Sequence, residues 1–345
     1  MLAPLQITRR QNRNAANVVI TGGSAGLGRA TAVEFARQGC NVAVIARDPA
    51  RLNEARRDIE GAGGRSLAFP VDVAEAKSVE AAADTVASEW NSIDVWVNCA
   101  MATVFAPFHE ITPEEFRRVI EVAFLGYVHG TMAALKHMRP RNAGTIVQVG
   151  SALSYRAIPL QSPYCACKFA IRGFTDSLRS ELLHDNSRIR LTMVQMPAFN
   201  TPQFDWARSK MSRKPMPMPP IFQPEFGARA IVRAAQTAPR ELWVGRPAIQ
   251  AILGTMVAPG WLDRFLARYG YDSQLSPQKA DPAEAGNLFA PVPGDFGAHG
   301  RFDRQSSQTS VVASGGTVRK VVAVAALAAS AGVLAIAALG RRNGR

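Results

Sequence analysis

Residues 17 to 28 read Asn-Val-Val-Ile-Thr-Gly-Gly-Ser-Ala-Gly-Leu-Gly, and an amphipathic helical pattern follows them. An apolar run, a glycine cluster and a helix in this order predict a strand, a tight turn and a helix N-terminus. Glycines let the backbone approach a pyrophosphate, and the free amides at the start of a helix favour its charge. The stretch therefore predicts a dinucleotide site at Gly22, Ser24, Gly26, Leu27 and Gly28.

Short apolar runs and longer amphipathic stretches alternate downstream of this turn. Strands are expected at 17–21, 41–46, 66–71, 93–99, 144–149, 190–196 and 241–245, and helices at 27–38, 49–60, 74–90, 113–137, 162–184 and 224–237. Nearly continuous apolar strands are typical of parallel sheets that are buried on both faces. We therefore expect an α/β fold, a Rossmann-type doubly wound parallel sheet of about seven strands, followed by a C-terminal extension and a transmembrane helix.

The composition bounds the class of protein. The chain has 345 residues, of which 47% are hydrophobic and 19% charged, so it can bury a large core and is neither disordered nor a disulfide framework. Its net charge of +13 is spread over several segments, and no helix-turn-helix, zinc or aromatic-basic RNA motif accompanies it, so we expect no nucleic-acid partner. The cysteines and histidines lack metal-ligand spacing, so we assign no metal.

Four regions are expected along the chain. Residues 1–16 form a polar arm without the apolar run of a signal peptide, and residues 17–270 form the catalytic domain. Residues 271–317 are rich in Asp, Gln, Pro, Gly and Ser, which predicts a poorly ordered linker. Residues 318–345 contain an uncharged stretch, 321–339, with basic residues on both sides.

At about 1.5 Å per residue this uncharged stretch extends roughly 28 Å, about the thickness of a bilayer core. It predicts a single-pass membrane anchor, with a buried helix as the alternative. Because the N-terminus lacks a signal peptide and the cysteines read as reduced thiols, the catalytic domain is expected on the cytoplasmic side.

The end of the second strand bears on the choice of dinucleotide. A carboxylate there would bind the ribose 2′-hydroxyl of NAD, but the chain reads Ala46-Arg47-Asp48. Arg47 could pair with a 2′-phosphate, which favours NADP over NAD. In the alternative interpretation Arg47 is a solvated loop residue and Asp48 only caps the next helix.

A tyrosine and a lysine lie four residues apart near the start of the helix expected at 162–184. This spacing places Tyr164 and Lys168 on one face. A nearby ammonium stabilises a phenolate, so the pair suits proton transfer at an oxygen atom. Ser151 follows the fifth strand.

Together these motifs make residues 17–245 resemble the classical short-chain dehydrogenase/reductase family. The matches are Thr21-Gly22-x-x-x-Gly26-x-Gly28, Asp72, Asn98-Cys99-Ala100, Ser151, Tyr164, Lys168, Pro197 and Thr201. The resemblance implies that Tyr164 is the general acid/base, that Lys168 tunes it and binds the nicotinamide ribose, and that Ser151 orients the substrate oxygen. It also implies cofactor contacts from Asp72 and Val73 at the adenine, Asn98 and Ala100 along the cleft, and Thr201 at the nicotinamide. Members of the family are usually homo-oligomers.

One departure from the family pattern concerns the proton relay. Ala123 stands where the family usually has an asparagine, and an alanine side chain cannot bind the relay water. The sequence predicts an NADP-dependent alcohol dehydrogenase or carbonyl reductase. The alternative is a catalytically weakened, NADP-binding membrane scaffold or redox sensor.

The segment 203–226 follows the sixth strand and contains interleaved Met, Pro and aromatic residues. In the family this segment covers the substrate, so its composition favours a lipophilic alcohol or ketone, such as a steroid-like or lipid molecule. An oligomer contact or ordinary packing is the alternative.

Overall fold

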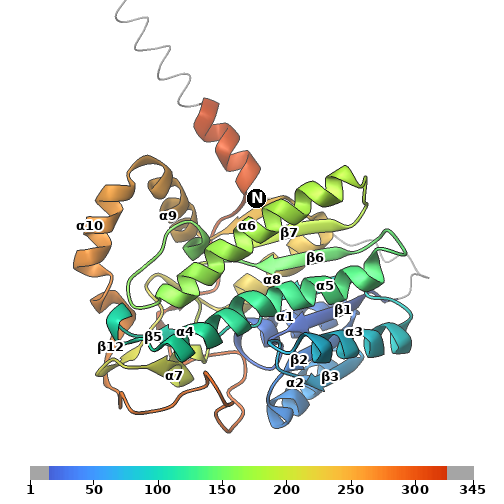
Figure 1. The fold of residues 1–345 in the computed structure, drawn as a ribbon, viewed down its shortest axis with the longest axis horizontal. Coiled ribbons are helices and arrows are strands. Elements are labelled where there is room, and N and C mark those ends of the chain that lie inside the picture. The colour runs from blue at the N-terminus through green and yellow to red at the C-terminus, as the bar shows by residue number, and fades with distance from the viewer. Residues whose placement is uncertain (1–14, 325–345) are drawn as a thin grey trace, which may run out of the picture.

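The computed structural model describes residues 15–324 and has one large central sheet (Figure 1). Its strands are β1 (Asn17–Thr21), β2 (Asn41–Ala46), β3 (Ser66–Pro70), β4 (Val95–Asn98), β6 (Thr145–Val149), β7 (Arg190–Gln195), β11 (Glu241–Val244) and β14 (Val312–Ser314). They lie in the order β14-β11-β7-β6-β4-β1-β2-β3. All run parallel except β14, which pairs antiparallel with β11. The doubly wound parallel sheet predicted from the sequence is confirmed.

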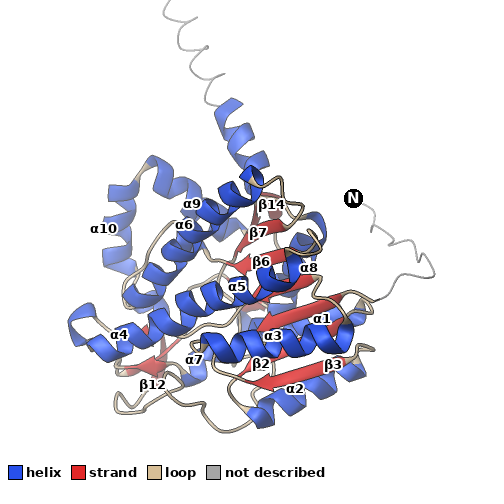
Figure 2. Cartoon of the chain, turned by 45° about the vertical axis from the view of Figure 1, so that its right-hand side comes forward, coloured by secondary structure: helices blue, strands red, loops and turns tan. Residues whose placement is uncertain are grey.

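Helices cover both faces of this sheet (Figure 2). They are α1 (Gly26–Arg37), α2 (Pro49–Gly61), α3 (Ala76–Trp90), α4 (Pro113–Ile120), α5 (Gly126–Met138), α6 (Ser162–His184) and α8 (Pro224–Thr237). Successive strand residues point to opposite faces, so Val19 packs with α3, α5 and α6 while Val18 and Ile20 pack with α1, α2 and α8. Each strand is therefore buried on both sides, as its continuous apolar sequence predicts.

Local signals in the sequence start two of these helices. Asp48 precedes α2, and its side chain accepts a hydrogen bond from the Arg51 amide. Thr112 and Glu115 form a reciprocal capping box at the start of α4. Between α4 and α5 the helix passes through a π-helical turn, Glu121–Leu125, which contains Ala123.

The segment 271–317 differs from its predicted linker state, because it packs along the domain. Leu288 of this segment is fully buried in the core of the domain, and Phe302 lies in a cluster with Phe105 and Phe204. Its last part supplies β14 at the edge of the sheet. Single buried apolar residues and main-chain hydrogen bonds hold the segment in place. Contacts of this kind produce no periodic pattern of apolar residues in the sequence.

Among residues 15–324, no helix is long and apolar enough to cross a membrane. The predicted anchor, 321–339, lies outside the described residues from 325 onward, and the polar arm 1–16 lies outside them as far as residue 14. A short helix, 315–324, follows β14 and projects from the domain (Figure 1).

Asn98 joins the sheet to α5 through a buried polar network. Its side-chain amide donates to Gln148 and Thr131, and its oxygen accepts from the Trp96 indole at 2.8 Å. Gly130 leaves room for this network, because a Cβ there would lie 2.2 Å from the Asn98 side-chain oxygen.

We therefore expect Gly130→Ala to lower the free energy of unfolding by about 1 to 3 kcal/mol, through overpacking of a buried polar network. Gly173→Ala, in α6, is the matched control, because nothing lies within 4 Å of its added Cβ. That variant should be neutral or more stable by up to about 1 kcal/mol. Denaturant unfolding of both variants measures the difference, and equal effects would contradict the packing argument.

Candidate active site

A cavity of about 460 Å³ opens beyond the carboxyl ends of the central strands, where ligands bind in doubly wound sheets. It brings together every site residue predicted from the sequence except Asn98. These lining residues are Gly22, Ser24, Gly26, Leu27, Gly28, Arg47, Asp72, Val73, Ala100, Ser151, Tyr164, Lys168 and Thr201. Asn98 is fully buried and its side chain is used by the network to α5, so the structure gives it a packing role away from the cavity.

The glycine turn after β1 has no space for side chains. Gly22 has φ 72°, and a Cβ there would lie 2.7 Å from Ala100 Cα. A Cβ on Gly28 would lie 2.2 Å from the Gly22 carbonyl oxygen. The turn therefore leads directly into the N-terminus of α1, where main-chain amides and the helix dipole suit a phosphate group. These residues fit a dinucleotide.

Lys168 is the most constrained charged group in the cavity. Its side chain is 2% exposed, and its ammonium donates to the Val149 carbonyl at 2.7 Å and to the Tyr127 hydroxyl at 3.1 Å. Tyr127 in turn donates to the same Val149 carbonyl. Two of the three ammonium protons are thus held, and the third is free to face the cavity.

Tyr164 lies beside this ammonium, as the four-residue spacing predicts. The Lys168 nitrogen is 5.3 Å from the centre of the Tyr164 ring. Burial lowers the pKa of Lys168 to about 8 and raises the pKa of Tyr164. In the protein alone the phenol therefore keeps its proton, which is the form that donates to a carbonyl oxygen.

Ser151 follows β6, and a local hydrogen bond orients its hydroxyl. Its hydroxyl accepts from the Leu153 amide at 3.1 Å, so the oxygen is fixed at the cavity wall and its own proton remains available. The structure therefore gathers Ser151, Tyr164 and Lys168 in one cavity.

The sequence reasoning missed Tyr127. Ala123, at the expected relay position, is fully buried and offers no polar side chain. Tyr127 lies four residues later, and its hydroxyl occupies the place beside the ammonium. The available signal was a tyrosine on the same helical stretch as Ala123, but only the tertiary structure shows that it points toward Lys168.

Three arginines gather at one end of the cavity, together with Asp48 and Asp72. Arg118 forms an ion pair with Asp72, while Arg47 and Arg51 line the cavity beside it. Burial and the two neighbouring cations lower the pKa of Arg47. The side-chain nitrogen Nε of Arg51 is buried without a hydrogen-bond partner in the described part of the chain. Sequence reasoning identified Arg47 but neither Arg51 nor Arg118.

The segment after residue 286 closes this end of the cavity. Arg47 donates to the main-chain carbonyls of Leu288 and Phe289, at 3.2 and 3.1 Å. The amide of Gly26, at the start of α1, donates to Gly297 at 3.0 Å. Arg47 is therefore not a solvated loop residue, because it is bonded to this segment. Asp48 caps α2, as the alternative interpretation predicts.

Apolar side chains line the opposite end of the cavity. They include Met216 and Met218, from the predicted lid 203–226. Two helices that sequence reasoning left without a firm role, α9 (Arg246–Val257) and α10 (Pro259–Tyr269), add further apolar residues, including Leu262 and Leu266. This end suits a nonpolar molecule better than a charged one.

Comparisons with known proteins agree with this arrangement. The sequence model of the family described as short chain dehydrogenase matches residues 16–212. An uncharacterized oxidoreductase, YxnA, of Bacillus subtilis is 32% identical over 275 residues, 79% of this chain and 77% of that protein. A 3-dehydrosphinganine reductase of Danio rerio is 30% identical over 246 residues, 68% of this chain and 73% of that protein. A 3-ketodihydrosphingosine reductase of Mus musculus is 30% identical over 207 residues, 59% and 62% of the two chains. The chain therefore belongs to the short-chain dehydrogenase/reductase family of oxidoreductases.

Proposed function

We propose that the protein is an NADP-dependent reductase of a lipophilic ketone, with the reverse oxidation of the alcohol as its other direction. The observation that carries the proposal is the buried Lys168 ammonium beside the protonated Tyr164, in a cavity that also contains the glycine turn. NADPH would supply the hydride. The chain's own residues would bind the ketone, hold its oxygen and supply the proton.

Each residue has a distinct role in this proposal. Tyr164 donates its proton to the ketone oxygen, and Ser151 donates a hydrogen bond to the same oxygen. Lys168 lowers the energy of the resulting phenolate, because an ammonium within a buried site is weakly screened. Tyr127 and the Val149 carbonyl orient the ammonium.

The lipophilic substrate is supported by the apolar end of the cavity, formed by the segment 203–226, α9 and α10. Two of the relatives are named for sphingoid ketones, which are long-chain carbonyl compounds. A long-chain ketone is therefore the first substrate class to test.

NADP is supported by the Nε atom of Arg51, which has no hydrogen-bond partner in the described part of the chain, and by Arg47, which pairs with no carboxylate there. Arg51 and Arg118 are already paired with Asp48 and Asp72. A 2′-phosphate would supply the missing acceptor. Arg47 would then share its guanidinium between the phosphate and the carbonyls of the segment after residue 286.

The alternative is an NADP-binding scaffold or a redox sensor. A scaffold would bind the cofactor without turnover of a ketone, and a redox sensor would need a reactive thiol. Burial raises the pKa of Cys99, which lines the cavity, to about 12, so this thiol stays protonated and is a poor sensor at neutral pH.

We also propose a membrane anchor in 321–339, a cytoplasmic catalytic domain and a homo-oligomer. The exposed side chains Leu125, Met132 and Phe169, on the α4–α6 side of the molecule, could form a subunit contact.

Tyr164→Phe tests the chemical step. We expect the variant to bind NADPH with an unchanged dissociation constant, measured by fluorescence, and to lose at least about 10²-fold in ketone turnover, since general acid catalysis contributes this much. Wild-type turnover across a panel of lipophilic ketones would refute the assigned proton donor. If the unmodified protein binds NADPH tightly but no ketone in the panel causes oxidation of the NADPH, the scaffold would be favoured.

Arg47→Ala tests the cofactor preference. Hydrogen bonds to a charged group contribute about 1.5 to 3 kcal/mol, so we expect the dissociation constant for NADPH to rise at least about tenfold and that for NADH to change little. Arg57→Ala, at an exposed site on α2 outside the cavity, removes the same charge and should affect neither. An equal loss for both cofactors in Arg47→Ala would mean that Arg47 does not recognise a 2′-phosphate.

Tyr127→Phe tests the positioning of Lys168. Without the hydroxyl, the buried ammonium loses one acceptor, so its pKa falls further below about 8. We expect the alkaline limb of kcat/KM for NADPH in ketone reduction to move to lower pH by about one unit. Tyr155→Phe, a buried tyrosine bonded to Glu241 instead, should leave that limb in place. An unshifted limb in Tyr127→Phe would assign Tyr127 a packing role only.

A further inference from the structure

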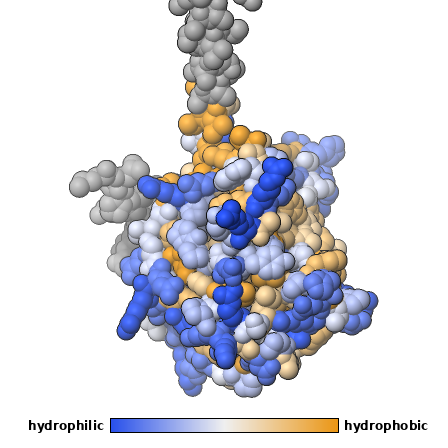
Figure 3. All heavy atoms as spheres, turned by 90° about the vertical axis from the view of Figure 1, so that its left-hand side faces the viewer, coloured by the Kyte–Doolittle hydropathy of each residue, from blue (hydrophilic) through white to orange (hydrophobic). Residues whose placement is uncertain are grey.

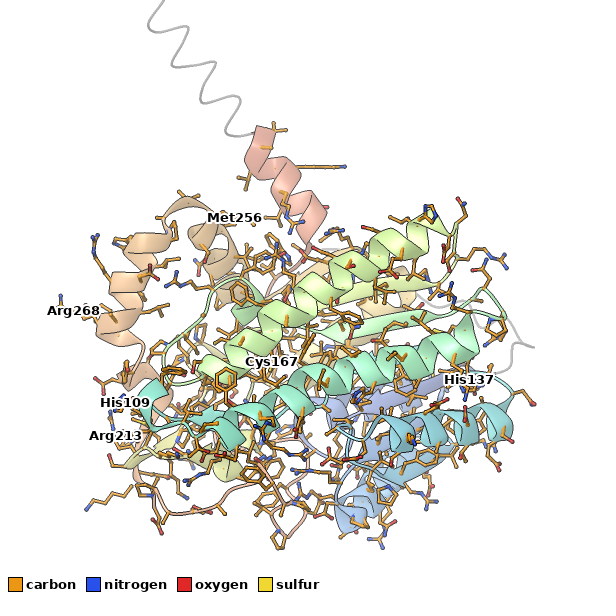
Figure 4. The ribbon with its side chains drawn as sticks, viewed as in Figure 1. His109, His137, Cys167, Arg213, Met256 and Arg268 are labelled. Carbon is orange, nitrogen blue, oxygen red and sulfur yellow. The ribbon has the colours of Figure 1, made fainter. Side chains whose placement is uncertain are left out.

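An apolar face on the outside of α9 and α10 is left without a partner in the described part of the chain. Met256 and Val257 end α9 and are 52% and 83% exposed, while Trp261 and Tyr269 on α10 are 62% and 51% exposed. We call these four residues, together with Phe265, the hairpin face. Figure 4 shows Met256 and Arg268 at the outer side of the two helices, away from the sheet.

The three aromatic residues of the hairpin face form one row. Trp261, Phe265 and Tyr269 follow each other at intervals of four residues, which places them on one side of α10. Their ring centres are 5.4 and 5.0 Å apart along the row. Trp and Tyr are the side chains enriched at the boundary between water and lipid, since each combines an apolar ring with a polar atom.

The same helix forms the wall of the cavity. Leu262 and Leu266 lie one position after Trp261 and Phe265 and line the cavity, and Phe265 itself is both 42% exposed and a lining residue. The apolar surface of α10 therefore runs without interruption from the outside of the molecule to the cavity. A nonpolar molecule could move between the two without crossing bulk water.

The charges next to the aromatic row are positive. Arg264 and Arg268 are exposed, and Arg268 lies over the Tyr269 ring at 5.6 Å. Within the described residues neither arginine pairs with a carboxylate, whereas Asp263 is paired with Arg156. An apolar row edged by unpaired arginines is complementary to an anionic lipid surface.

The chain leaves the described part of the structure close to this face. Val318, in the helix 315–324, packs against the buried cluster of Tyr155, Trp243 and Ile252, and Ile252 belongs to α9. Val321, Val322 and Val324 in this helix are exposed. The part of the projecting helix next to the domain is orange in Figure 3. The sequence continues to residue 339 without a charge. The projecting helix therefore starts beside α9, and in Figure 1 it lies in the upper part of the molecule, as does the α9–α10 hairpin.

We infer that the hairpin face docks on a bilayer that contains anionic lipid, with α10 lying in the headgroup region. The docking does not depend on the proposed reaction. Its consequence rests on that reaction: a lipophilic ketone would enter the cavity along α10 directly from the bilayer.

Tryptophan fluorescence tests the docking without any measurement of activity. Trp261 is the exposed tryptophan, and the other four, Trp90, Trp96, Trp206 and Trp243, are at most 8% exposed. The full chain is mixed with vesicles of phosphatidylcholine and phosphatidylglycerol whose acyl chains are brominated. We expect quenching of the emission relative to unbrominated vesicles, and loss of that quenching in Trp261→Phe. Protein that floats with the vesicles while Trp261 stays unquenched would overturn the inference.

A double variant at the end of α9 provides a second test of the docking. Met256→Glu/Val257→Glu should reduce the quenching of Trp261 at least threefold, because two carboxylates would enter an anionic surface. Leu183→Glu/His184→Glu, at the C-terminal end of α6, is the matched control, since Leu183 is 70% exposed and lies outside the hairpin face. Equal quenching in both variants would contradict docking through the hairpin face. A dimer in sedimentation of the full chain that Met256→Glu/Val257→Glu dissociates would replace the bilayer with a second copy of the chain.

Discussion

The proposed active site depends on one buried ammonium group, that of Lys168. The Lys168 ammonium has left water almost completely, and only the Val149 carbonyl and the Tyr127 hydroxyl hold it within the described chain. An ammonium in such a place is costly, which is why its pKa falls to about 8. The same burial strengthens the attraction between the ammonium and a negative charge that would develop on Tyr164, because little solvent screens the two charges.

Tyr127 places a polar group beside the ammonium in a helical stretch where position 123 has none. An asparagine at position 123 would act on the lysine through water, whereas here a tyrosine four residues later reaches the ammonium directly. The π-helical turn Glu121–Leu125 lies between α4 and α5, next to this contact. The loss of one polar side chain in the sequence is therefore matched by another that the fold brings to the same nitrogen atom.

The segment after residue 286 connects the cofactor end of the cavity to the rest of the chain. Its carbonyls accept hydrogen bonds from Arg47 and from the Gly26 amide at the start of α1, so the groups proposed to bind the cofactor also hold this segment. Composition predicts a linker there, because the segment has few apolar residues and no period. It is held by isolated anchors such as Leu288 and Phe302, and contacts of this kind are specified only by the domain on which they lie.

The sequence by itself determined the seven parallel strands, the helices that cover them and the three catalytic candidates, but not the edge strand β14 or the helices α9 and α10. Those elements follow from local patterns, namely continuous apolar strands, helix caps, the glycine turn and the Tyr164–Lys168 spacing. It could not show that the Asn98 side chain belongs to a buried packing network, that the Tyr127 hydroxyl contacts the Lys168 ammonium, or that Arg51 and Arg118 lie near Arg47. These features depend on contacts between residues far apart in the chain, and only the tertiary structure decides which side chains meet.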